Sequence, residues 1–414
     1  MMTKDNVFLD STLVAREMLR LLHANLGFVG SITRTYSDEF AQKGAKIGDR
    51  VQIRMPNKFK GREGRIFDRS LIRERTIDIS LNRYKGVDMA VTSEDLTLDL
   101  DDFSKRLLRP GAKQLATHIE SDVLSLTHQV GSTVYCDQPH RVGVGEVLRG
   151  KRLLDDSLVP RRGRRGLFCP AHKLTMTESV RDHYNPAVAI GRVYRDQGFG
   201  RLSGFDYEDT TVMPPLVSGG AALGQTSIQL KEALSGNNLI SCAITNGAEL
   251  KPGDSFAFDQ GYAVHPETKA PYPYLKFFSV VSVETDNGQT RLTFTPPMDL
   301  RGPYRNVSIG RDGPQSEGGE LERGTFILKQ FPANGFMESS LLYHPDAFGF
   351  VTAGLEVPRG VDFAARETHD GISMRVVRDY DPERDEMLCR FDVLYGYGLL
   401  DGSQACRLVS RAPD

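Results

Sequence analysis

The sequence predicts an α+β fold in which a hairpin, a long helix and a block of short strands follow one another along the chain. The helix is the clearest signal, because apolar residues recur every three or four positions over residues 100–129. Alternating strands before the helix, and short strands with tight turns after it, supply the β part. The chain has 414 residues, which is enough for two or three domains.

The predicted helix over residues 100–129 would span roughly 45 Å at 1.5 Å per residue, longer than most globular helices. Pro110 interrupts it, so we expect a kink or a short first helix that ends near Leu108. Its apolar face consists of Leu100, Phe103, Leu107, Gly111, Leu115, Ile119, Val123, Leu126 and, just beyond, Val130. An acidic run that suits the positive end of the helix dipole precedes it: Glu94, Asp95, Asp99, Asp101 and Asp102.

Two further elements are predicted ahead of the long helix. Residues 11–23 form an amphipathic helix with Leu13, Val14, Met18, Leu21 and Leu22 on its apolar side. Residues 51–85 form a long hairpin with ten basic and four acidic residues, a net charge of +6. Because the hairpin tip is too polar to form a core, it either stays solvated or lies against another molecule. Its candidate contact residues are Arg54, Lys58, Lys60, Arg62, Arg65 and Arg69.

Residues 131–165, which follow the helix, are expected to be rich in loops. They end in the basic motif PRRGRRG, residues 160–166, which suits either phosphate contact or a solvated loop. From residue 217 to residue 322 the pattern changes to short strands with tight turns, typical of a small inserted β-barrel. Lys251-Pro252-Gly253-Asp254 is a turn signature, and Asp286-Asn287-Gly288 between alternating runs indicates a hairpin.

No catalytic or metal-binding motif emerges from the sequence. Residues 219–226, GGAALGQT, nearly fit a phosphate-binding loop, but Gln225 stands where the lysine is required. His118 and Asp122 lie one helical turn apart, which is more typical of a helix surface than of a two-ligand metal site. The five cysteines form no CxxC pair and the nine histidines form no cluster. We therefore expect no enzyme activity, no cofactor and no metal.

Composition indicates an ordinary soluble protein that stays in the cytosol after synthesis. The net charge is −2, so no overall basic field points to nucleic acid. Hydrophobic residues make up 39% and charged residues 26% of the chain, which are ordinary values. The first twelve residues contain no apolar signal core, and no run of eighteen apolar residues occurs anywhere, so we expect no membrane contact.

Three stretches of the sequence resemble the coat proteins of tailed bacteriophages. Residues 85–124, KGVDMAVTSEDLTLDLDDFSKRLLRPGAKQLATHIESDVL, are similar to the passage that leads into their spine helix. Residues 36–59 look like the start of their extended loop, and residues 370–408 look like their closing strands. The order of the parts also matches the Hong Kong 97-type fold, and the inserted strands resemble podophage coat proteins that carry an insertion domain.

The resemblance implies a division of the chain into named parts. These are an N-terminal arm (1–47), an extended loop (48–86), a peripheral domain (87–165), an axial domain (166–216 and 323–369), an inserted β-barrel (217–322), peripheral closing strands (370–398) and an axial end (399–414). Some relatives crosslink a loop lysine to a neighbouring asparagine. Lys58 and Lys60 lie in the corresponding loop, although two solvated lysines are the preferred interpretation.

The resemblance implies a major capsid protein of the virion, assembled in the host cytoplasm into the pentamers and hexamers of an icosahedral shell around double-stranded DNA. The sequence shows no long helical leader, so a separate scaffolding protein is implied, with a portal protein, decoration proteins and unspecific DNA contact as further partners. The alternatives are an encapsulin-like nanocompartment shell and a cytosolic multidomain enzyme with an accessory barrel. Arg62, Arg65 and Arg69 are expected to approach the acidic run of an adjacent subunit, since the hairpin tip reaches roughly 30 Å.

Overall fold

The structure is a computed structural model that describes residues 11–34, 50–59, 65, 74–92, 104–138, 142–183, 201–230, 239–243, 250–286, 289–310, 321, 325–382 and 386–412. The chain divides into two compact units, each made from several stretches. Unit 1 contains residues 1–54, 76–123 and 348–398, and unit 2 contains residues 55–75, 124–347 and 399–414.

Unit 1 is built on a five-stranded antiparallel sheet with long strands. Its strands are β3 (Arg83–Thr92), β17 (Phe348–Ala353), β18 (Phe363–His369), β19 (Ile372–Asp381) and β20 (Glu386–Leu399). They run in the order β17-β20-β19-β18, and β3 pairs with β20 from Arg83↔Tyr395 to Thr92↔Glu386. Strands β19 and β20 lie in the stretch (370–398) where strands were expected.

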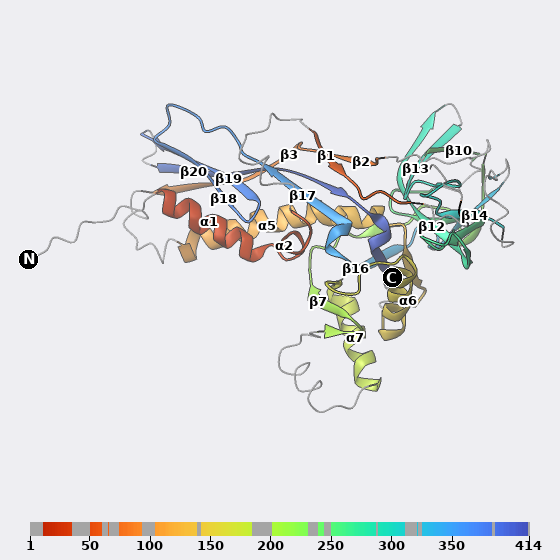
Figure 1. Cartoon of the computed structure of the whole chain (residues 1–414). Helices are drawn as coiled ribbons and strands as arrows, with labels where there is room; N and C mark the ends of the chain where they lie inside the picture. The colour runs from red at the N-terminus through yellow and green to blue at the C-terminus, as the bar shows by residue number, and fades with distance from the viewer. Residues whose placement is uncertain are drawn as a thin grey trace, which may run out of the picture. The chain divides into compact units, whose positions relative to one another are not determined.

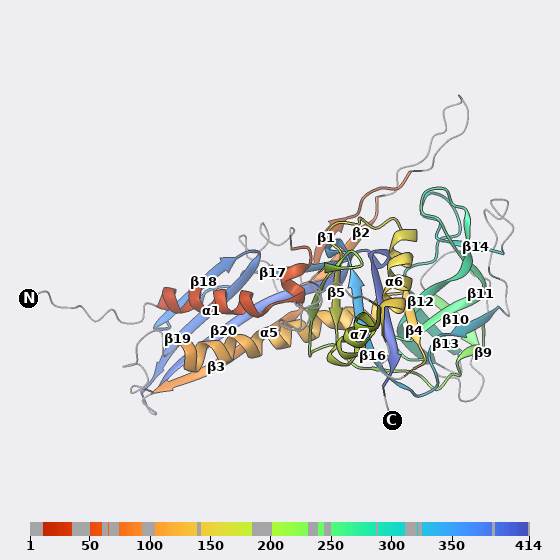
Figure 2. The same cartoon turned by 90° about the horizontal axis from the view of Figure 1, so that it is seen from below.

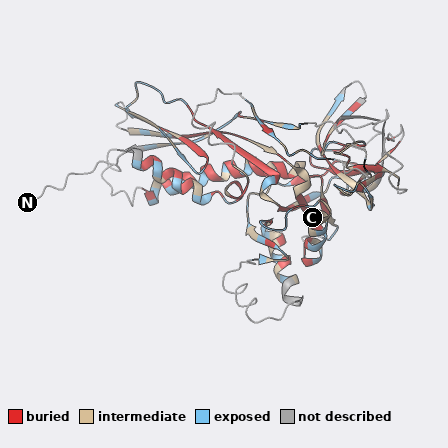
Figure 3. Cartoon of the chain, viewed as in Figure 1, coloured by how far each residue is buried: buried red, intermediate tan, exposed pale blue. Residues whose placement is uncertain are grey.

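Helices α1 (Ser11–Asn25) and α5 (Arg109–Leu124) lie side by side against one face of this sheet (Figures 1 and 2). The apolar side of α1 is buried at Val14, Met18 and Leu22, whereas Leu13 is exposed. Figure 3 shows buried residues along both helices and on the strands that they cover. A short helix, α2 (Phe28–Ser31), follows α1, and the buried carboxylate of Glu120 on α5 accepts hydrogen bonds from the backbone N–H groups of Phe28 and Val29.

The long helix is irregular next to Pro110, where a kink or break was predicted. A π-helical turn, η2 (Ser104–Leu108), precedes α5, so Pro110 lies in the first turn of α5, where its missing N–H costs no helical hydrogen bond. A 3₁₀ turn, η3 (Ser125–Gln129), extends the helix at its other end. The predicted apolar face is confirmed from Gly111 to Val130, where every member is buried, while Leu100 and Phe103 lie outside the described residues.

The hairpin begins as a pair of short strands in unit 1, β1 (Arg50–Arg54) and β2 (Thr76–Ser80), in the register Arg50↔Ser80 to Arg54↔Thr76. Both predicted strands are therefore confirmed at the base of the hairpin. This base packs on β20 at Gly396, where any Cβ would overlap the backbone oxygen of Ser80. Gly398 lies against Ile79 in the same way. The two glycines let the hairpin base approach β20 more closely than any other residue would allow.

Unit 2 contains a second sheet covered by two helices. Its strands run in the order β4-β21-β16-β5-β7-β6, and β8 pairs with β16. The strands are β4 (Thr133–Cys136), β5 (Arg165–Phe168), β6 (Arg201–Leu202), β7 (Phe205–Asp209), β8 (Leu216–Val217), β16 (Phe336–Tyr343) and β21 (Ala405–Arg411). Helices α6 (Val144–Asp156) and α7 (Pro170–His183) share one apolar core with it through Val147, Met176, Leu342 and Leu408.

The presence of β4 and α6 corrects the expectation that residues 131–165 are mainly loop. The structure places a strand at Thr133–Cys136 and a three-turn helix at Val144–Asp156 in this stretch. Sequence inspection missed the helix because its glycines, including Gly145 and Gly150, are poor helix formers. Gly150 is needed, since a Cβ there would approach Leu342 within 2.8 Å. Tight helix-on-sheet packing has overridden local propensity.

The remaining strands of unit 2 form a sheet that closes on itself. The order is β12-β13-β10-β9-β15-β11-β14, and β12 also pairs with β11. The strands are β9 (Gly224–Leu230), β10 (Leu239–Ala243), β11 (Ser255–Val264), β12 (Pro271–Asp286), β13 (Gln289–Thr295), β14 (Val307–Ile309) and β15 (Phe326–Lys329). Phe256, Phe258, Phe278 and Phe294 fill its interior, mostly in edge-to-face contacts. We call this structure the closed sheet.

Two turn predictions in the closed sheet are confirmed, and its expected end is wrong by one strand. Strands β12 and β13 pair up to Asp286↔Gln289, as the hairpin signal predicted. Asp254 donates its backbone N–H to Lys251 O across the predicted turn, and Gly253 there has a φ of +93°. Strand β15 lies beyond residue 322, yet it pairs with both β9 and β11. The closed sheet therefore extends past its expected end.

The other described elements are two short 3₁₀ turns, η5 (Pro345–Ala347) and η6 (Gly402–Gln404). None of the described helices combines the length and the apolar character needed to cross a bilayer.

We expect Gly396→Ala to loosen the hairpin base. The added methyl group overlaps the backbone of Ser80, and overpacking of this kind typically costs about 1–3 kcal/mol. Hydrogen exchange should become faster at residues 76–80, and chemical denaturation should show lower stability. Gly145→Ala is the matched control, because nothing lies within 4 Å of a Cβ at Gly145. Unchanged exchange at residues 76–80 would show that the close approach does not constrain the hairpin.

A fragment of residues 217–330 should fold alone, whereas residues 217–322 should not. Only the longer fragment contains β15, which joins β9 to β11 and places Ile327 in the core of the closed sheet. A proton–nitrogen correlation spectrum should be dispersed for the longer fragment and collapsed for the shorter one. Equal dispersion for both fragments would mean that β15 is dispensable for closure.

Candidate functional site

The candidate contact residues of the hairpin lie partly in the described structure. Arg54, Lys58 and Arg65 are described, and all three are exposed. The other predicted residues lie outside the described residues, namely Lys60, Arg62, Arg69, Glu94, Asp95, Asp99, Asp101 and Asp102. Contact between the hairpin and the acidic run therefore remains a prediction.

The basic motif at residues 160–166 is only half available to a ligand. Arg164 is buried, donates to the backbone oxygens of Val159 and Pro160, and pairs with Asp155 at 2.8 Å. Arg165 lies in β5 and pairs with Glu208 at 2.6 Å. Arg161 and Arg162 are exposed. Two of the four arginines thus have a structural role that the sequence did not reveal.

The two weak motifs of the sequence also have structural roles. In the stretch that resembles a phosphate loop, the carbonyl oxygens of Gly219 and Ala221 accept hydrogen bonds from the ammonium group of Lys329. His118 is exposed and bonds to Gln114, while Asp122 accepts a hydrogen bond from the Tyr395 hydroxyl at 2.7 Å. His118 and Asp122 therefore have separate partners, as the helix-surface interpretation predicted.

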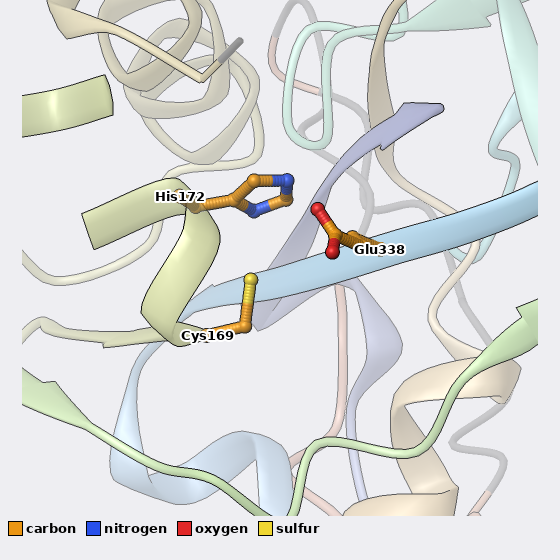
Figure 4. Close-up of side chains that lie close together, drawn as sticks. All are labelled: Cys169, His172 and Glu338. Carbon is orange, nitrogen blue, oxygen red and sulfur yellow. The ribbon is translucent and has the colours of Figure 1, made fainter. Parts of the chain in front are cut away.

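One cluster of metal-ligand types occurs among the described residues, in unit 2. Cys169, His172 and Glu338 bring a thiol, an imidazole and a carboxylate within 4.8 Å of one another, and their side chains face each other in Figure 4. Cys169 directly precedes α7, His172 lies in its first turn, and Glu338 comes from β16. This cluster was not predicted, although the Cys-x-x-His spacing is a sequence signal for its first two members.

Hydrogen bonds within the cluster favour a structural role over metal binding. Nδ1 of His172 lies 2.8 Å from the Ser340 hydroxyl, and Nε2 lies 2.8 Å from the Ser410 hydroxyl. The Ser340 hydroxyl also accepts the Cys169 backbone N–H and approaches the Cys169 sulfur. Burial raises the pKa of the Cys169 thiol, whereas a metal ligand must be a thiolate. The cluster ties α7 to β16 and β21.

A second buried polar group joins the closed sheet to the neighbouring sheet of unit 2. Arg407 on β21 is 1% exposed and donates to Gly253 O at 2.9 Å, Ser279 Oγ at 3.2 Å and Thr133 Oγ1 at 3.3 Å. Gly253 and Ser279 belong to the closed sheet or its turn, whereas Thr133 lies on β4. Burial lowers the pKa of Arg407 to about 10, which still leaves it charged at neutral pH.

Asp254 and Lys329 form a buried ion pair beside this arginine, with 3.8 Å between their charged atoms and no exposed side-chain surface. The Asp254 carboxylate also accepts from Ser218 Oγ and from the backbone N–H groups of Gly219 and Lys251. Its charge stabilises the Arg407 guanidinium. We call Arg407, Asp254, Lys329 and their bonded neighbours the sheet junction.

His128, in the 3₁₀ turn after α5, completes the sheet junction. Its backbone oxygen accepts a hydrogen bond from Ser279 Oγ, and its ring lies beside Gly253. Burial, reinforced by the Arg407 charge, lowers the pKa of His128 to about 4, although a hydrogen bond to the Pro214 backbone opposes the shift. Within the described structure its buried Nε2 has no hydrogen-bond partner. The imidazole is therefore neutral at pH 7.

Comparison with known proteins finds similarity only among solved structures. No protein-family model and no curated protein matches the chain. A structure described as Mycobacterium phage Che8 is 11% identical, covers 92% of this chain and 90% of its own, and has a TM-score of 0.43. The capsid of cyanophage P-SCSP1u is 8% identical over 89% and 85%, with a TM-score of 0.41. A virus-like particle from Pyrococcus furiosus is 8% identical over 95% and 96%, with a TM-score of 0.36.

We expect acid to destabilise the chain through His128. The unfolded histidine binds a proton below pH 6.5 and the folded one only near pH 4, so protons favour unfolding between these values. The loss should reach about 3 kcal/mol at pH 4. His128→Asn, which cannot titrate, should flatten this part of the stability–pH curve measured by urea unfolding.

The exposed histidine on α5 provides the control for this experiment. His118→Asn removes a histidine outside the sheet junction, so its stability–pH curve should have the same slope as that of the wild type. If the His128→Asn and wild-type curves stay parallel between pH 4 and 6.5, proton binding at His128 does not govern acid stability.

Proposed function

We propose that this chain is a major capsid protein of a tailed bacteriophage. Copies of it assemble with a separate scaffolding protein into the pentamers and hexamers of an icosahedral shell that encloses double-stranded DNA. In this role the chain acts by packing against its own copies and against unspecific DNA phosphates, and it catalyses no reaction.

The observation that carries the proposal is that most of each of the three stretches resembling coat proteins lies in unit 1. Residues 85–124 supply β3 and α5, and residues 370–408 supply β19 and β20. Strand β3 pairs with β20 along its whole length. Residues 36–59 supply β1, and the hairpin that β1 begins packs on β20 at Gly396. An independent sequence resemblance and the packing of this unit therefore involve the same segments.

The closed sheet supports the insertion-type assignment. It occupies one continuous part of the chain, from β9 to β15, between strands β8 and β16, which pair with each other. A unit inserted between two paired strands leaves the sheet of its host intact. We infer that the closed sheet stabilises the subunit and contacts neighbouring capsomers.

The hairpin is the arm proposed to hold neighbouring subunits together. Its base is held in unit 1, because β1 pairs with β2 and β2 packs on β20. Arg54, Lys58 and Arg65 are exposed. Exposed ion pairs contribute only about 0–1 kcal/mol each, and salt weakens them. Repeated at every subunit boundary, contacts between Arg62, Arg65 and Arg69 and an adjacent acidic run still favour closure of the shell.

Purified full-length protein should sediment as capsomers or shells, and should form regular particles when its scaffolding protein is added. Velocity sedimentation and negative-stain microscopy measure both outcomes directly. A stable monomer at high concentration, with or without scaffold, would contradict the capsid assignment. An enzyme with an accessory barrel would instead sediment as a small oligomer.

A charge-reversal variant separates the role of the hairpin from the assignment itself. Arg62, Arg65 and Arg69 changed together to glutamate should block shell closure while circular dichroism shows a native fold. Arg161 and Arg162, exposed in another basic motif, provide the control when changed to glutamate. If the hairpin variant forms closed shells normally at low salt, the hairpin contact is not needed for closure. This result would not contradict the capsid assignment.

A further inference from the structure

A basic pocket lies in unit 2 at one side of the closed sheet. Its volume is about 90 Å³, enough for a small ion but far below that of a nucleotide site. It is lined by the end of β11, the start of β12, the loop at residues 304–306, the last turn of α6 and the passage that contains Lys58. Five stretches of the chain thus meet around one small space.

Positive charge dominates the lining of this pocket. Lys58, Lys269, Lys276 and Arg305 line it, with Asp156 as the single carboxylate, so the net formal charge is 4 − 1 = +3. Asp156 is already engaged, because it accepts a hydrogen bond from the Tyr274 hydroxyl at 2.9 Å and lies 3.6 Å from Arg152. The carboxylate therefore offers little compensation to the three lysines.

The lysines are close enough to repel one another. Burial and the charges of Lys58 and Arg305 lower the pKa of Lys269 to about 8, against the opposing charge of Asp299. Burial also lowers the pKa of Lys276. The charge of Lys58 lowers this pKa further, whereas the charge of Asp401 raises it. Within the described residues no ion pair involves any of these three ammonium groups, and like charges held together without a counter-ion favour anion binding.

The pocket also fixes the position of its central ammonium group. Lys269 donates to the backbone oxygens of Pro303 at 2.6 Å and Arg305 at 3.2 Å, which leaves one of its three N–H groups for a ligand. Tyr304 stands beside it, held by the Arg75 guanidinium 4.1 Å from its ring centre. Arg75 in turn pairs with Asp299. A rigid, positively charged donor is therefore in place before any ligand arrives.

We propose that this pocket is a binding site for an oxyanion of the phosphate class. A net charge of +3 suits a doubly charged tetrahedral anion better than a single carboxylate, and the volume admits one such group. The source is either free phosphate, including a phosphomonoester, or a backbone phosphate of nucleic acid. The site does not depend on the capsid assignment.

Isothermal titration of full-length protein with inorganic sulfate tests the proposal, because sulfate keeps its double charge between pH 6 and pH 8. We expect saturable binding, with net proton uptake at pH 8 that disappears at pH 6. A bound anion raises the pKa of Lys269, which is partly neutral only at the higher pH. The charged and titratable groups around Lys269 and its pocket are Lys58, Lys276, Arg305, Asp299, Asp156, Tyr272, Tyr274, Tyr304, His265 and Glu267.

Three variants locate the site. Lys269→Met should abolish the proton uptake and weaken sulfate binding at least tenfold. Lys58→Gln changes an exposed side chain that the fold does not need, and should weaken binding roughly fivefold. Lys113→Gln, at an exposed position on α5, should bind as the wild type does. Absence of saturable binding at millimolar sulfate, or equal affinity of Lys58→Gln and wild type, would overturn the proposal.

Competition identifies the source of the anion. Displacement of sulfate by a short DNA duplex, lost in Lys58→Gln, assigns the site to nucleic-acid phosphate. Displacement by inorganic phosphate without competition by the duplex assigns it to free phosphate or a phosphomonoester. Acetate that binds as tightly as sulfate would show a general carboxylate site and refute the phosphate class.

Discussion

The buried charges of the sheet junction determine how unit 2 is organised. Arg407 reaches from β21 to the turn at Gly253, and Asp254 in that turn lies beside Lys329 on β15. Removing charges from water costs several kcal/mol per ion, so such a group persists only when each member is paired and hydrogen-bonded. The junction therefore specifies where the closed sheet attaches, more than it adds stability.

Close backbone approach has the same organising role in unit 1. Gly111 on α5 lies directly against Met89 on β3, and Gly396 on β20 lies against the carbonyl of Ser80 at the hairpin base. Glu120 holds the passage after α1 to α5 through two backbone N–H groups. These contacts hold the hairpin base and the passage after α1 in place within unit 1.

Polar side chains in the described interior connect structural elements to one another. The imidazole of His172 bonds to two serines on different strands, Arg164 satisfies carbonyls of its own loop, and the sheet junction joins two sheets. These particular groups are therefore engaged in hydrogen bonds within the fold. The basic pocket differs, because its three lysines form no ion pair among the described residues. Binding in this chain is therefore expected at surfaces and shallow pockets.

Local elements could be predicted from the sequence, whereas the contacts between distant elements could not. The helical stripe from Gly111 to Val130 and the hairpin at residue 286 follow from periodicity and turn chemistry, which act over a few residues. No local pattern predicts that the charged residues Arg164, Lys329 and Arg407 are buried. Likewise β15, the meeting of His172 with Glu338 and the basic pocket depend on pairing between distant strands. Local signals do not record long-range pairing, since its stability comes from packing and hydrogen bonds that exist only in the folded chain.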